Sequence, residues 1–335
     1  MSVRFELPGE LSASAPPEAR GVARDEVRLL VASPSAVHHT VFSALGDHLR
    51  PGDLLVVNTS GTLPAAVDAR RGGHTVVVHF STELADGAWV VELRAPGGPL
   101  LDGRPGERLD LPGGASLTLL AEHVPGQARL WRAAASVLVP GLLAASGRPI
   151  RYGYVPRAWP LSDYQTVFAR EPGSAEMPSA ARPFTDALVT RLVTDGVLVA
   201  PLLLHTGVSS LETGEPPQAE RFRVPATTAA LVSWVRTRGG RVIAVGTTAA
   251  RALESAFDGS AVGAAEGWTD LVLGPDRPAR FVDGIVTGLH APDASHLLLL
   301  EAVAGPELVQ RAYDAAVERR YLWHEFGDVS LLLRR

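Results

Sequence analysis

The strongest constraint on the fold is the alternation of helical patterns with apolar, strand-like runs between residues 184 and 333. The helical patterns occupy residues 184–196, 227–240, 249–257, 296–305 and 307–323, and the strand-like runs occupy 197–208, 241–248 and 326–333. Strands that alternate with helices indicate a mostly parallel sheet with helices on its faces. The runs at 26–32 and 49–58 are also strand-like, so we expect them to join this sheet.

The stretch between residues 60 and 150 has a different character. Its short β-rich runs, such as 74–80 and 88–95, are separated by breaks that are rich in glycine and proline. Closely spaced short strands with turn signals are typical of a small barrel or sandwich. The sequence therefore predicts an α/β domain made of residues 1–58 and 152–335, with a small β domain, residues 59–151, inserted into it.

The composition excludes several kinds of chemistry. The chain has 335 residues and contains neither cysteine nor lysine. Thiolate nucleophiles, Cys-ligated metals, Schiff-base lysines and P-loop lysines are therefore excluded. The net charge of -5 gives no overall attraction to nucleic acid, although a local basic patch stays possible. The start of the chain lacks an apolar signal core and no apolar run is long enough for a membrane helix, so we expect a cytoplasmic protein without membrane contact.

Polar residues follow four of the predicted strands. In an open parallel sheet, ligands bind beyond the carboxyl ends of the strands. The candidate segments are 58–60, 205–207, 246–248 and 287–290. Thr247 or Thr248 can cap the following helix, whose free N–H groups, with Arg251 and Glu254, suit a carboxylate or a hydroxylated ligand. The alternative is a plain capped helix with a surface ion pair.

Two histidines and one loop are further candidates. His205 and His290 each follow a strand, and each is either a core residue or part of a site. The loop in 173–189 contains Glu176 and Ser179 and is either a surface loop or the wall of a substrate site. Thr185 is the expected N-cap of the helix that follows. No metal-binding pattern is present in the sequence, so we predict no metal site.

A helical pattern is expected over residues 162–170. It places Tyr164 and Phe168 on one face, as core residues, and leaves Gln165 freer. Neither a nucleophilic-serine motif nor a glycine-rich dinucleotide motif occurs in the sequence, which removes the usual support for hydrolase and dehydrogenase functions.

Taken in order, several stretches resemble those of one enzyme family. They are LRPGDLLVVNTS, DYQTVFAREPGS, RVIAVGTTAARALESA, GWTDLVLGP, FVDGIVTGLHAPDASHLLLLEAVAG and AYDAAVERRYLWHEFGDVSLLL. The chain resembles the S-adenosylmethionine:tRNA ribosyltransferase-isomerases of queuosine biosynthesis from about residue 5 to residue 333. The resemblance implies an α/β sandwich domain with a small six-stranded β-barrel domain.

The resemblance also implies an activity. In that family the ribosyl part of S-adenosylmethionine is moved onto an aminomethyl-deazaguanine of tRNA and rearranged, while adenine and methionine leave. S-adenosylmethionine would be a co-substrate, no metal is needed, and we expect a monomer. A base, an acid for the leaving adenine and firm positioning must come from the protein.

The matching positions give a set of expected site residues. We assign proton transfer to His205 with Glu176 or Glu220 as its partner. The expected S-adenosylmethionine-binding residues are Asn58, Thr59, Gly207, Gly246, Thr247, Thr248, Arg251 and Glu254. The expected residues for the acceptor are Tyr164, Gln165, Ser179, Thr185, His290, Ser295 and Asp328. Arg251 would hold the methionine carboxylate or a phosphate.

The chain also departs from the family pattern. A family histidine is replaced by Pro183, and a His-x-His-Ser-Glu stretch is replaced by residues 217–220. Two alternatives therefore stay open at this point. One is a divergent enzyme that performs related sulfonium chemistry on a small molecule without tRNA, and the other is a non-catalytic homologue that binds a ligand or RNA.

Overall fold

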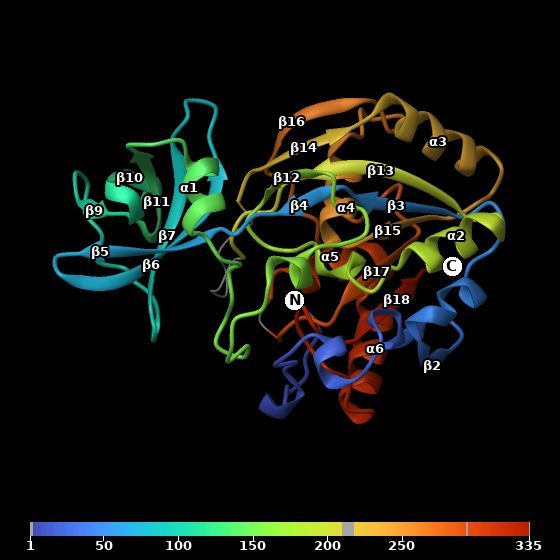
Figure 1. Cartoon of the computed structure of the whole chain (residues 1–335). Helices are drawn as coiled ribbons and strands as arrows, with labels where there is room; N and C mark the ends of the chain where they lie inside the picture. The colour runs from blue at the N-terminus through green and yellow to red at the C-terminus, as the bar shows by residue number, and fades with distance from the viewer. Residues whose placement is uncertain (1–2, 210–217, 293, 335) are drawn as a thin grey trace.

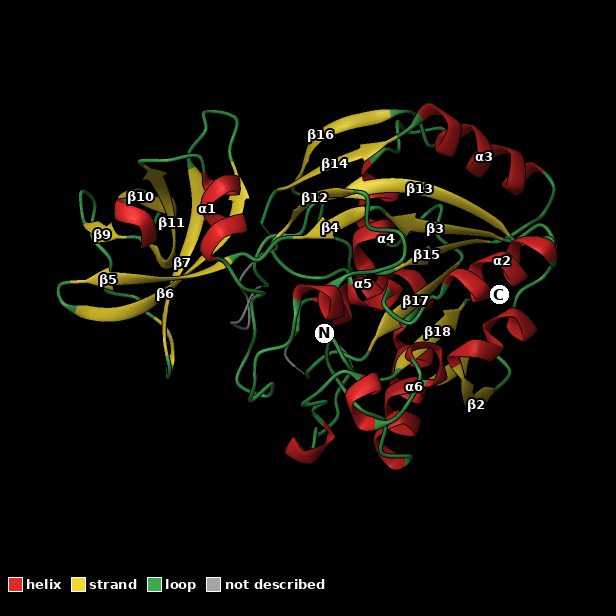
Figure 2. Ribbon diagram, in the orientation of Figure 1, coloured by secondary structure: helices red, strands yellow, loops and turns green. Residues whose placement is uncertain are grey.

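The computed structural model describes residues 3–209, 218–292 and 294–334. Figure 1 shows a small β body, drawn in cyan and green on one side, that is joined to a larger α/β body. Figure 2 shows that strands dominate the small body, whereas helices surround the sheet of the larger one. The α/β body with an inserted β unit that the sequence predicts is therefore the observed architecture.

In the described part of the chain, nine strands form the large sheet, in the order β16-β14-β13-β3-β15-β17-β18-β1-β2. Their bounds are β16 Ala265–Thr269, β14 Glu220–Val224, β13 Leu198–Leu204, β3 Leu54–Asn58, β15 Val242–Val245, β17 Gly284–Gly288, β18 Val329–Leu333, β1 Arg28–Ala32 and β2 Val37–Val41.

The sheet is mixed rather than mostly parallel. The central strands β13, β3, β15 and β17 are parallel to one another. Antiparallel pairings join β17 to β18, β1 to β2, β13 to β14 and β14 to β16. One reason for the difference is that an apolar pattern predicts a strand such as β18 but not its direction. Another is that β14, β16 and β2 are short and partly exposed, so their patterns do not stand out in the sequence. The carboxyl ends of the four central strands still lie at one edge, together with the amino end of β18.

Helices cover both faces of this sheet. On one face, α3 (Ala226–Thr237), α4 (Thr247–Ser255), α5 (His296–Ala304) and α6 (Pro306–Glu318) bury apolar side chains against it. On the other face, α2 (Asp186–Thr194) and the 3-10 helix η4 (Phe42–His48) do the same. The apolar faces that the helical patterns predict are thus the faces that pack on the sheet. No helix within the described ranges has the length and apolar character needed to cross a bilayer.

Six strands of the described chain close into an antiparallel barrel, in the order β11-β10-β9-β5-β6-β7, because β11 pairs back to β7. Their bounds are β5 Ala66–Arg71, β6 His74–Glu83, β7 Trp89–Ala95, β9 Arg108–Asp110, β10 Ser116–Val124 and β11 Gln127–Ala135, and the two-residue β8 (Gly98–Pro99) pairs with β7. Apolar side chains fill the barrel interior, among them the fully buried Val78, Phe80 and Leu117. The six-stranded barrel that the family resemblance implies is confirmed.

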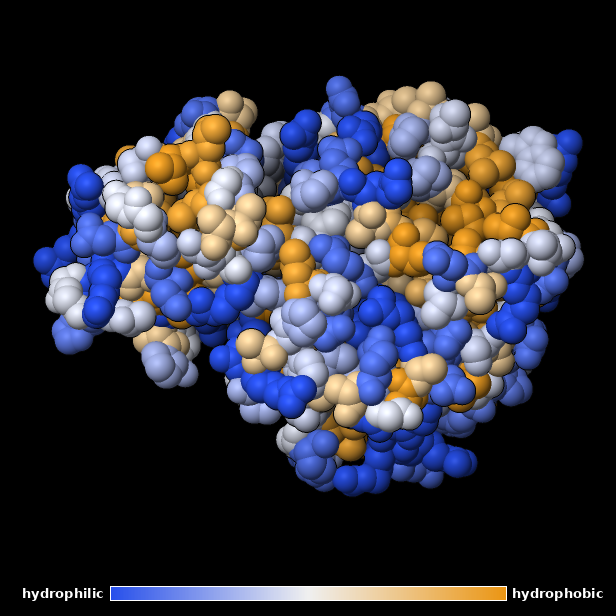
Figure 3. Space-filling view, in the orientation of Figure 1, coloured by the Kyte–Doolittle hydropathy of each residue, from blue (hydrophilic) through white to orange (hydrophobic). Residues whose placement is uncertain are grey.

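One helix of the small body was not anticipated. Helix α1 (Val139–Ser146) packs Val139, Leu142 and Leu143 against the barrel core. Pro140 reads as a break in an apolar run, but proline in the first turn of a helix costs no backbone hydrogen bond. Figure 3 shows hydrophobic residues on the barrel surface near α1, interspersed with hydrophilic ones.

Two sets of hydrogen bonds join the segments that connect the bodies. Strand β4 (Ser60–Thr62) pairs in parallel with β12 (Glu171–Ser174). Ala66 and Arg148 exchange two backbone hydrogen bonds of 2.9 Å. The domain boundaries at residues 58/59 and 151/152 stay predictions.

The expected helix over residues 162–170 is not formed. A 3-10 helix, η6 (Leu161–Tyr164), ends where the side-chain amide of Gln165 pairs with the backbone N–H and C=O of Thr62 at 3.0 and 2.8 Å. Tyr164 is buried as predicted, but it packs in a different cluster from Phe168. The hydrogen bonds between Gln165 and Thr62 outweigh the local helical spacing of Tyr164 and Phe168 here.

Candidate functional site

A cavity of about 780 Å³ lies at the edge of the sheet where β13, β15 and β17 end. Segments that follow these strands line it, namely 206–209, 246–248 and 287–291, as does the loop 175–180. The carboxyl-end position that the sequence predicts for a ligand site is therefore the position of the cavity. Of the expected site residues, those that line it are Tyr164, Glu176, Ser179, Gly207, Glu220, Gly246, Thr247, Thr248, Arg251, His290 and Ser295.

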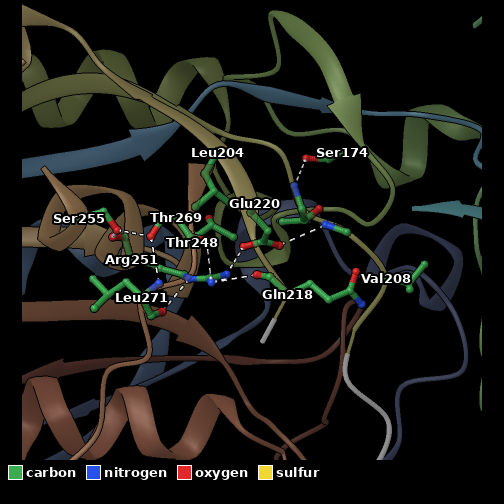
Figure 4. Close-up of polar contacts among 12 residues, drawn as sticks. Ser174, Leu204, Val208, Gln218, Glu220, Thr248, Arg251, Ser255, Thr269 and Leu271 are labelled. Atoms are coloured by element: carbon green, nitrogen blue, oxygen red, sulfur yellow. Dashed lines mark hydrogen bonds and ion pairs between the residues drawn. The ribbon is translucent and has the colours of Figure 1, made fainter. Parts of the chain in front are cut away.

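One side of the cavity is built around an arginine that is fully engaged with protein groups. We call Gln218, Glu220, Thr248 and Arg251 the arginine side. Arg251 Nη1 donates to Glu220 Oε2 at 2.6 Å, Nε donates to the carbonyl of Leu271 at 2.9 Å, and Nη2 donates to the carbonyls of Gln218 and Thr269. Figure 4 shows the guanidinium in the middle of these acceptors. Each of its three nitrogens therefore already has a protein partner.

Glu220 connects this arginine to the loop after β13. Its Oε1 accepts from the backbone N–H of Gly207 at 3.1 Å. Burial raises the pKa of Glu220, although the charge of Arg251 opposes the shift. Sequence reasoning placed Glu254 beside Arg251 as a ligand group, but its Oε1 accepts the backbone N–H groups of residues 280–282 and it does not line the cavity.

The turn into α4 has a structural requirement for glycine. Gly246 has a φ of 93° and forms the N-cap of α4 without a side-chain cap bond. The expected capping by Thr247 or Thr248 is therefore not observed. Instead Thr248 Oγ1 accepts from Asn58 Nδ2 at 3.2 Å, and Asn58 also bonds both backbone groups of Leu204. Asn58 thus joins β3, β13 and α4 behind the cavity wall rather than in it.

His205 lies outside the group of residues that line the cavity. Its side chain is buried, its Nδ1 lies 2.7 Å from Ser60 Oγ, and Gly173 packs so closely on the ring that a Cβ there would clash. Burial lowers the pKa of His205, although Glu171 opposes the shift. Ser60 Oγ in turn lies 2.5 Å from Ser174 Oγ. The proton-transfer role of His205 stays a prediction.

A second part of the cavity wall consists of tyrosines and carboxylates. We call Tyr152, Tyr154, Tyr164, Glu176 and Glu325 the tyrosine side. The hydroxyl of Tyr152 donates to Glu176, which also accepts from the backbone N–H and the hydroxyl of Ser209 at 2.8 and 2.5 Å. The hydroxyl of Tyr154 donates to Glu325 at 2.6 Å.

Burial perturbs the ionisation of the tyrosine side. It raises the pKa of Glu325 to about 7, although the hydrogen bond from Tyr154 opposes the shift. The pKa values of Tyr152 and Tyr154 are also raised, first by burial and then by the adjacent carboxylates. The ring of His324 stacks on that of Tyr154 at 4.0 Å between centroids, and burial lowers the pKa of His324 to about 4.

Two stacked histidines form a third part of the wall. The rings of His290 and His296 lie 4.5 Å apart with an interplanar angle of 4°. Burial lowers the pKa of both, and the charge of Arg251 lowers that of His296 further. The two rings are therefore neutral near pH 7, and His290 Nε2 is paired with Thr287 Oγ1 at 3.0 Å.

Four expected residues lie elsewhere in the framework. Thr59 Oγ1 donates to the carbonyl of Leu202, and Gln165 pairs with the backbone of Thr62. Thr185 caps α2 as predicted, with its Oγ1 accepting from the N–H of Leu188 at 3.2 Å. Asp328 accepts from Arg28 and from the backbone of Leu322. These contacts hold chain segments together outside the cavity lining.

Sequence reasoning missed several lining residues: Tyr152, Tyr154, Gln218, His296, His324 and Glu325. Because β18 runs antiparallel to β17, the residues just before β18 lie at the same edge of the sheet as the ends of the central strands. The sequence gives no signal for the direction of β18, so it could not place His324 and Glu325, which precede β18, at this edge. Within the described ranges, no group of three or more His, Cys, Asp or Glu residues is arranged to hold a metal ion.

Comparison with known proteins identifies the family. Residues 1–332 match the family described as queuosine biosynthesis protein. The chain belongs to this family. Similar members are named S-adenosylmethionine:tRNA ribosyltransferase-isomerase. The one from Heliobacterium modesticaldum is 34% identical over 98% of both chains, and the one from Anaeromyxobacter dehalogenans is 36% identical over 99% of this chain and 98% of the relative.

A solved structure of the queuosine biosynthesis family supports the fold. It is the S-adenosylmethionine tRNA ribosyltransferase of Thermotoga maritima, with 28% identity and a TM-score of 0.56. The similarity covers 99% of this chain and all of the other. The family membership expected from the sequence motifs is confirmed, and the family is one of enzymes.

Proposed function

We propose that this protein transfers the ribosyl part of S-adenosylmethionine to an aminomethyl-deazaguanine in tRNA and rearranges it, releasing adenine and methionine. The observation that carries the proposal is the family match over residues 1–332, because that range contains every segment of the cavity wall. Relatives named S-adenosylmethionine:tRNA ribosyltransferase-isomerase match this chain over 98% of their length.

The cavity suits S-adenosylmethionine in size and lining. Its volume of about 780 Å³ lies within the range of small-molecule sites, roughly 300–1,000 Å³. Apolar side chains of Leu271, Leu273 and Leu299 line part of it. The amide of Gln218 is buried, and neither its nitrogen nor its oxygen has a hydrogen-bond partner within the described residues. A glutamine amide can pair with the N6 and N7 edge of adenine, so we assign Gln218 to the adenine.

The carboxylates of the wall suit a positively charged substrate. The sulfonium makes the neighbouring CH₂ of the sugar acidic, so a base of modest strength is sufficient for deprotonation. Glu176 and Glu220 both line the cavity, and Glu220 lies beside Arg251. Both glutamates stay candidates for proton transfer. His205 is hydrogen-bonded to Ser60, and Ser60 to Ser174, which accepts from the backbone N–H of Thr206. Any part of His205 in proton transfer would therefore pass through these two serines to the loop that carries Thr206 and Gly207.

The first experiment measures release of adenine and methionine from S-adenosylmethionine by mass spectrometry. The full-length protein is incubated with tRNA bearing the aminomethyl base, with tRNA lacking it, and without tRNA. We expect release only with the modified tRNA, together with a gain in its mass.

The other outcomes change the assignment. Release with a small-molecule extract but not with tRNA would move the acceptor to a metabolite. No release with any acceptor, while S-adenosylmethionine still binds, would contradict the proposed activity. A His205→Gln variant with full turnover would remove that histidine from proton transfer.

A further inference from the structure

The tyrosine side contains two tyrosine–glutamate pairs next to each other. The rings of Tyr152 and Tyr154 lie 6.2 Å apart, and each hydroxyl donates to its own carboxylate, Glu176 or Glu325. The carboxylates are near enough that the charge of Glu176 contributes to the raised pKa of Glu325. The residues come from three chain segments, 152–154, 176 and 325, so the arrangement exists only in the folded protein.

This side of the cavity has an excess of acceptors and negative charge. A carboxylate has about four acceptor positions. Glu325 accepts from Tyr154 and from one backbone group. Glu176 accepts three hydrogen bonds from Tyr152 and Ser209, so each carboxylate keeps at least one free position. Glu176 and Glu325 form no ion pair with a basic side chain in the part of the chain that the structure describes. The arginine in the described lining, Arg251, is already paired with Glu220.

An independent observation also indicates a ligand here. Tyr164 lines the same cavity and is only 3% exposed, yet its hydroxyl has no hydrogen-bond partner within the described ranges. Its ring packs against Phe326 at 5.0 Å, and the charge of Glu325 acts on its hydroxyl. A buried hydroxyl without a partner costs about 1–3 kcal/mol of desolvation, which a ligand group can compensate.

We propose that Glu176, Glu325 and the Tyr164 hydroxyl form a subsite for a primary ammonium group, which takes the aminomethyl group of the acceptor base. This inference rests on the proposed function and names the residues that recognise its acceptor. A primary ammonium has three donors, which match two carboxylates and one hydroxyl oxygen.

The subsite also has the chemistry to prepare the amine for attack. An ammonium must lose a proton before its nitrogen has a lone pair to donate. The carboxylate of Glu325 can accept that proton, since burial brings its pKa to about 7, and it becomes a neutral acid while the amine becomes neutral. No further reactant is required for this proton transfer.

The test compares the binding of two free bases to the full-length protein by calorimetry at pH 8. One is 7-aminomethyl-7-deazaguanine, and the other is 7-methyl-7-deazaguanine, which lacks the amine. We expect the amine to bind at least about tenfold more tightly, as charge-assisted hydrogen bonds contribute on this scale. Glu325→Gln and Glu176→Gln should each reduce that ratio by about tenfold.

Controls separate the subsite from general charge effects and from misfolding. Glu83→Gln removes one exposed carboxylate from barrel strand β6 and should leave the ratio unchanged. The wild-type protein gives a test without substitution: the ratio should fall between pH 8 and pH 5.5, because Glu325 becomes protonated while the alkylammonium keeps its charge. A ratio near one for the wild type at pH 8, or a ratio that neither glutamate variant changes, would overturn the subsite.

The two proposals can fail separately. Selective binding of the amine without adenine release would keep the subsite and reject the ribosyl transfer. Adenine release with tRNA, combined with equal binding of the two bases, would keep the transfer and reject the subsite.

Discussion

The two sides of the cavity use the same kinds of residue in opposite ways. On the arginine side, each nitrogen of the Arg251 guanidinium and each carboxylate oxygen of Glu220 has a hydrogen-bond partner. On the tyrosine side, Glu325 keeps free acceptor positions and Tyr164 keeps an unpartnered hydroxyl. Saturated polar groups stabilise a wall, whereas unsaturated ones are available to a ligand. Substitutions of the saturated groups should therefore lower stability, whereas substitutions of the unsaturated groups should lower ligand binding or turnover.

The largest effect is expected from Arg251→Ala. The change removes four hydrogen bonds and leaves the largely buried carboxylate of Glu220 without its partner. Removing one member of a buried ion pair typically costs about 3–5 kcal/mol of unfolding free energy. Urea denaturation at pH 7.5 would measure this loss. A loss below about 1 kcal/mol, or an S-adenosylmethionine affinity that changes while stability does not, would make Arg251 a ligand residue instead.

Glu325→Gln should lower turnover by about ten- to a hundredfold while the fold is kept. Its effect on stability should depend on pH. Burial raises the folded-state pKa of Glu325 to about 7 from an ordinary value of 4.5. Between these values the unfolded chain is ionised and the folded one is protonated, so the contribution of Glu325 to stability falls as the pH rises from 4.5 to 7. The variant lacks this contribution.

The measurement for Glu325 is the difference in unfolding free energy between wild type and variant at pH 5 and at pH 8. The unfolding free energy of the variant, relative to that of the wild type, should be larger at pH 8 than at pH 5. An identical difference at the two pH values would mean that the carboxyl titrates normally and is not desolvated.

Gln218→Leu should have a more moderate effect. The side chain lies on the arginine side, but its amide is unpartnered there, unlike the other polar groups of that side. Loss of one bidentate contact with a base costs about 1–3 kcal/mol of binding free energy. We therefore expect KM for S-adenosylmethionine to rise about tenfold or more, with little change in the free energy of unfolding. Steady-state kinetics with saturating tRNA would measure it. An unchanged KM would exclude Gln218 from adenine recognition.

Tyr154→Phe should give the smallest change. It removes the hydroxyl that donates to Glu325 but keeps the ring that stacks on His324. We expect turnover to fall by only a few fold, and the pH at which turnover is half-maximal to rise, because the hydrogen bond from Tyr154 lowers the pKa of Glu325. A pH–rate profile would measure the shift. A profile that does not move, or that moves toward lower pH, would separate Tyr154 from the ionisation of Glu325.

The sequence predicts the framework of this molecule better than its cavity. Helices α2 to α6 and the central strands follow from periodicity, because each buries one apolar face within a short stretch of chain. The edge of the sheet where the cavity lies also follows from strand order. By contrast, β16 is the edge strand and β14 lies next to it, two of the five residues in each strand are exposed, and their pattern is weak.

The individual cavity residues are harder to predict because their roles depend on distant partners. Glu254 and Arg251 lie three positions apart on one helix, yet one bonds the backbone before β17 and the other bonds Glu220. Tyr152 and Glu325 belong to loops far apart in the sequence, so no local spacing brings them together. Local patterns therefore identify which segments reach the site, whereas tertiary contacts decide which side chains stay available.

The reciprocal hydrogen bonds between Ala66 and Arg148 have a consequence for how the chain folds. They fasten the two ends of the segment that contains the barrel strands to each other. Once the barrel has formed, residues 66 and 148 are held together, so the inserted segment acts as a short connection between the two parts of the α/β body. The entropy cost of closing that connection then does not depend on the number of residues in the barrel. Lengthening a barrel turn costs little in any case, about 0.6 kcal/mol for each doubling of a flexible loop. Changes of length within the barrel are therefore compatible with an unchanged sheet and cavity.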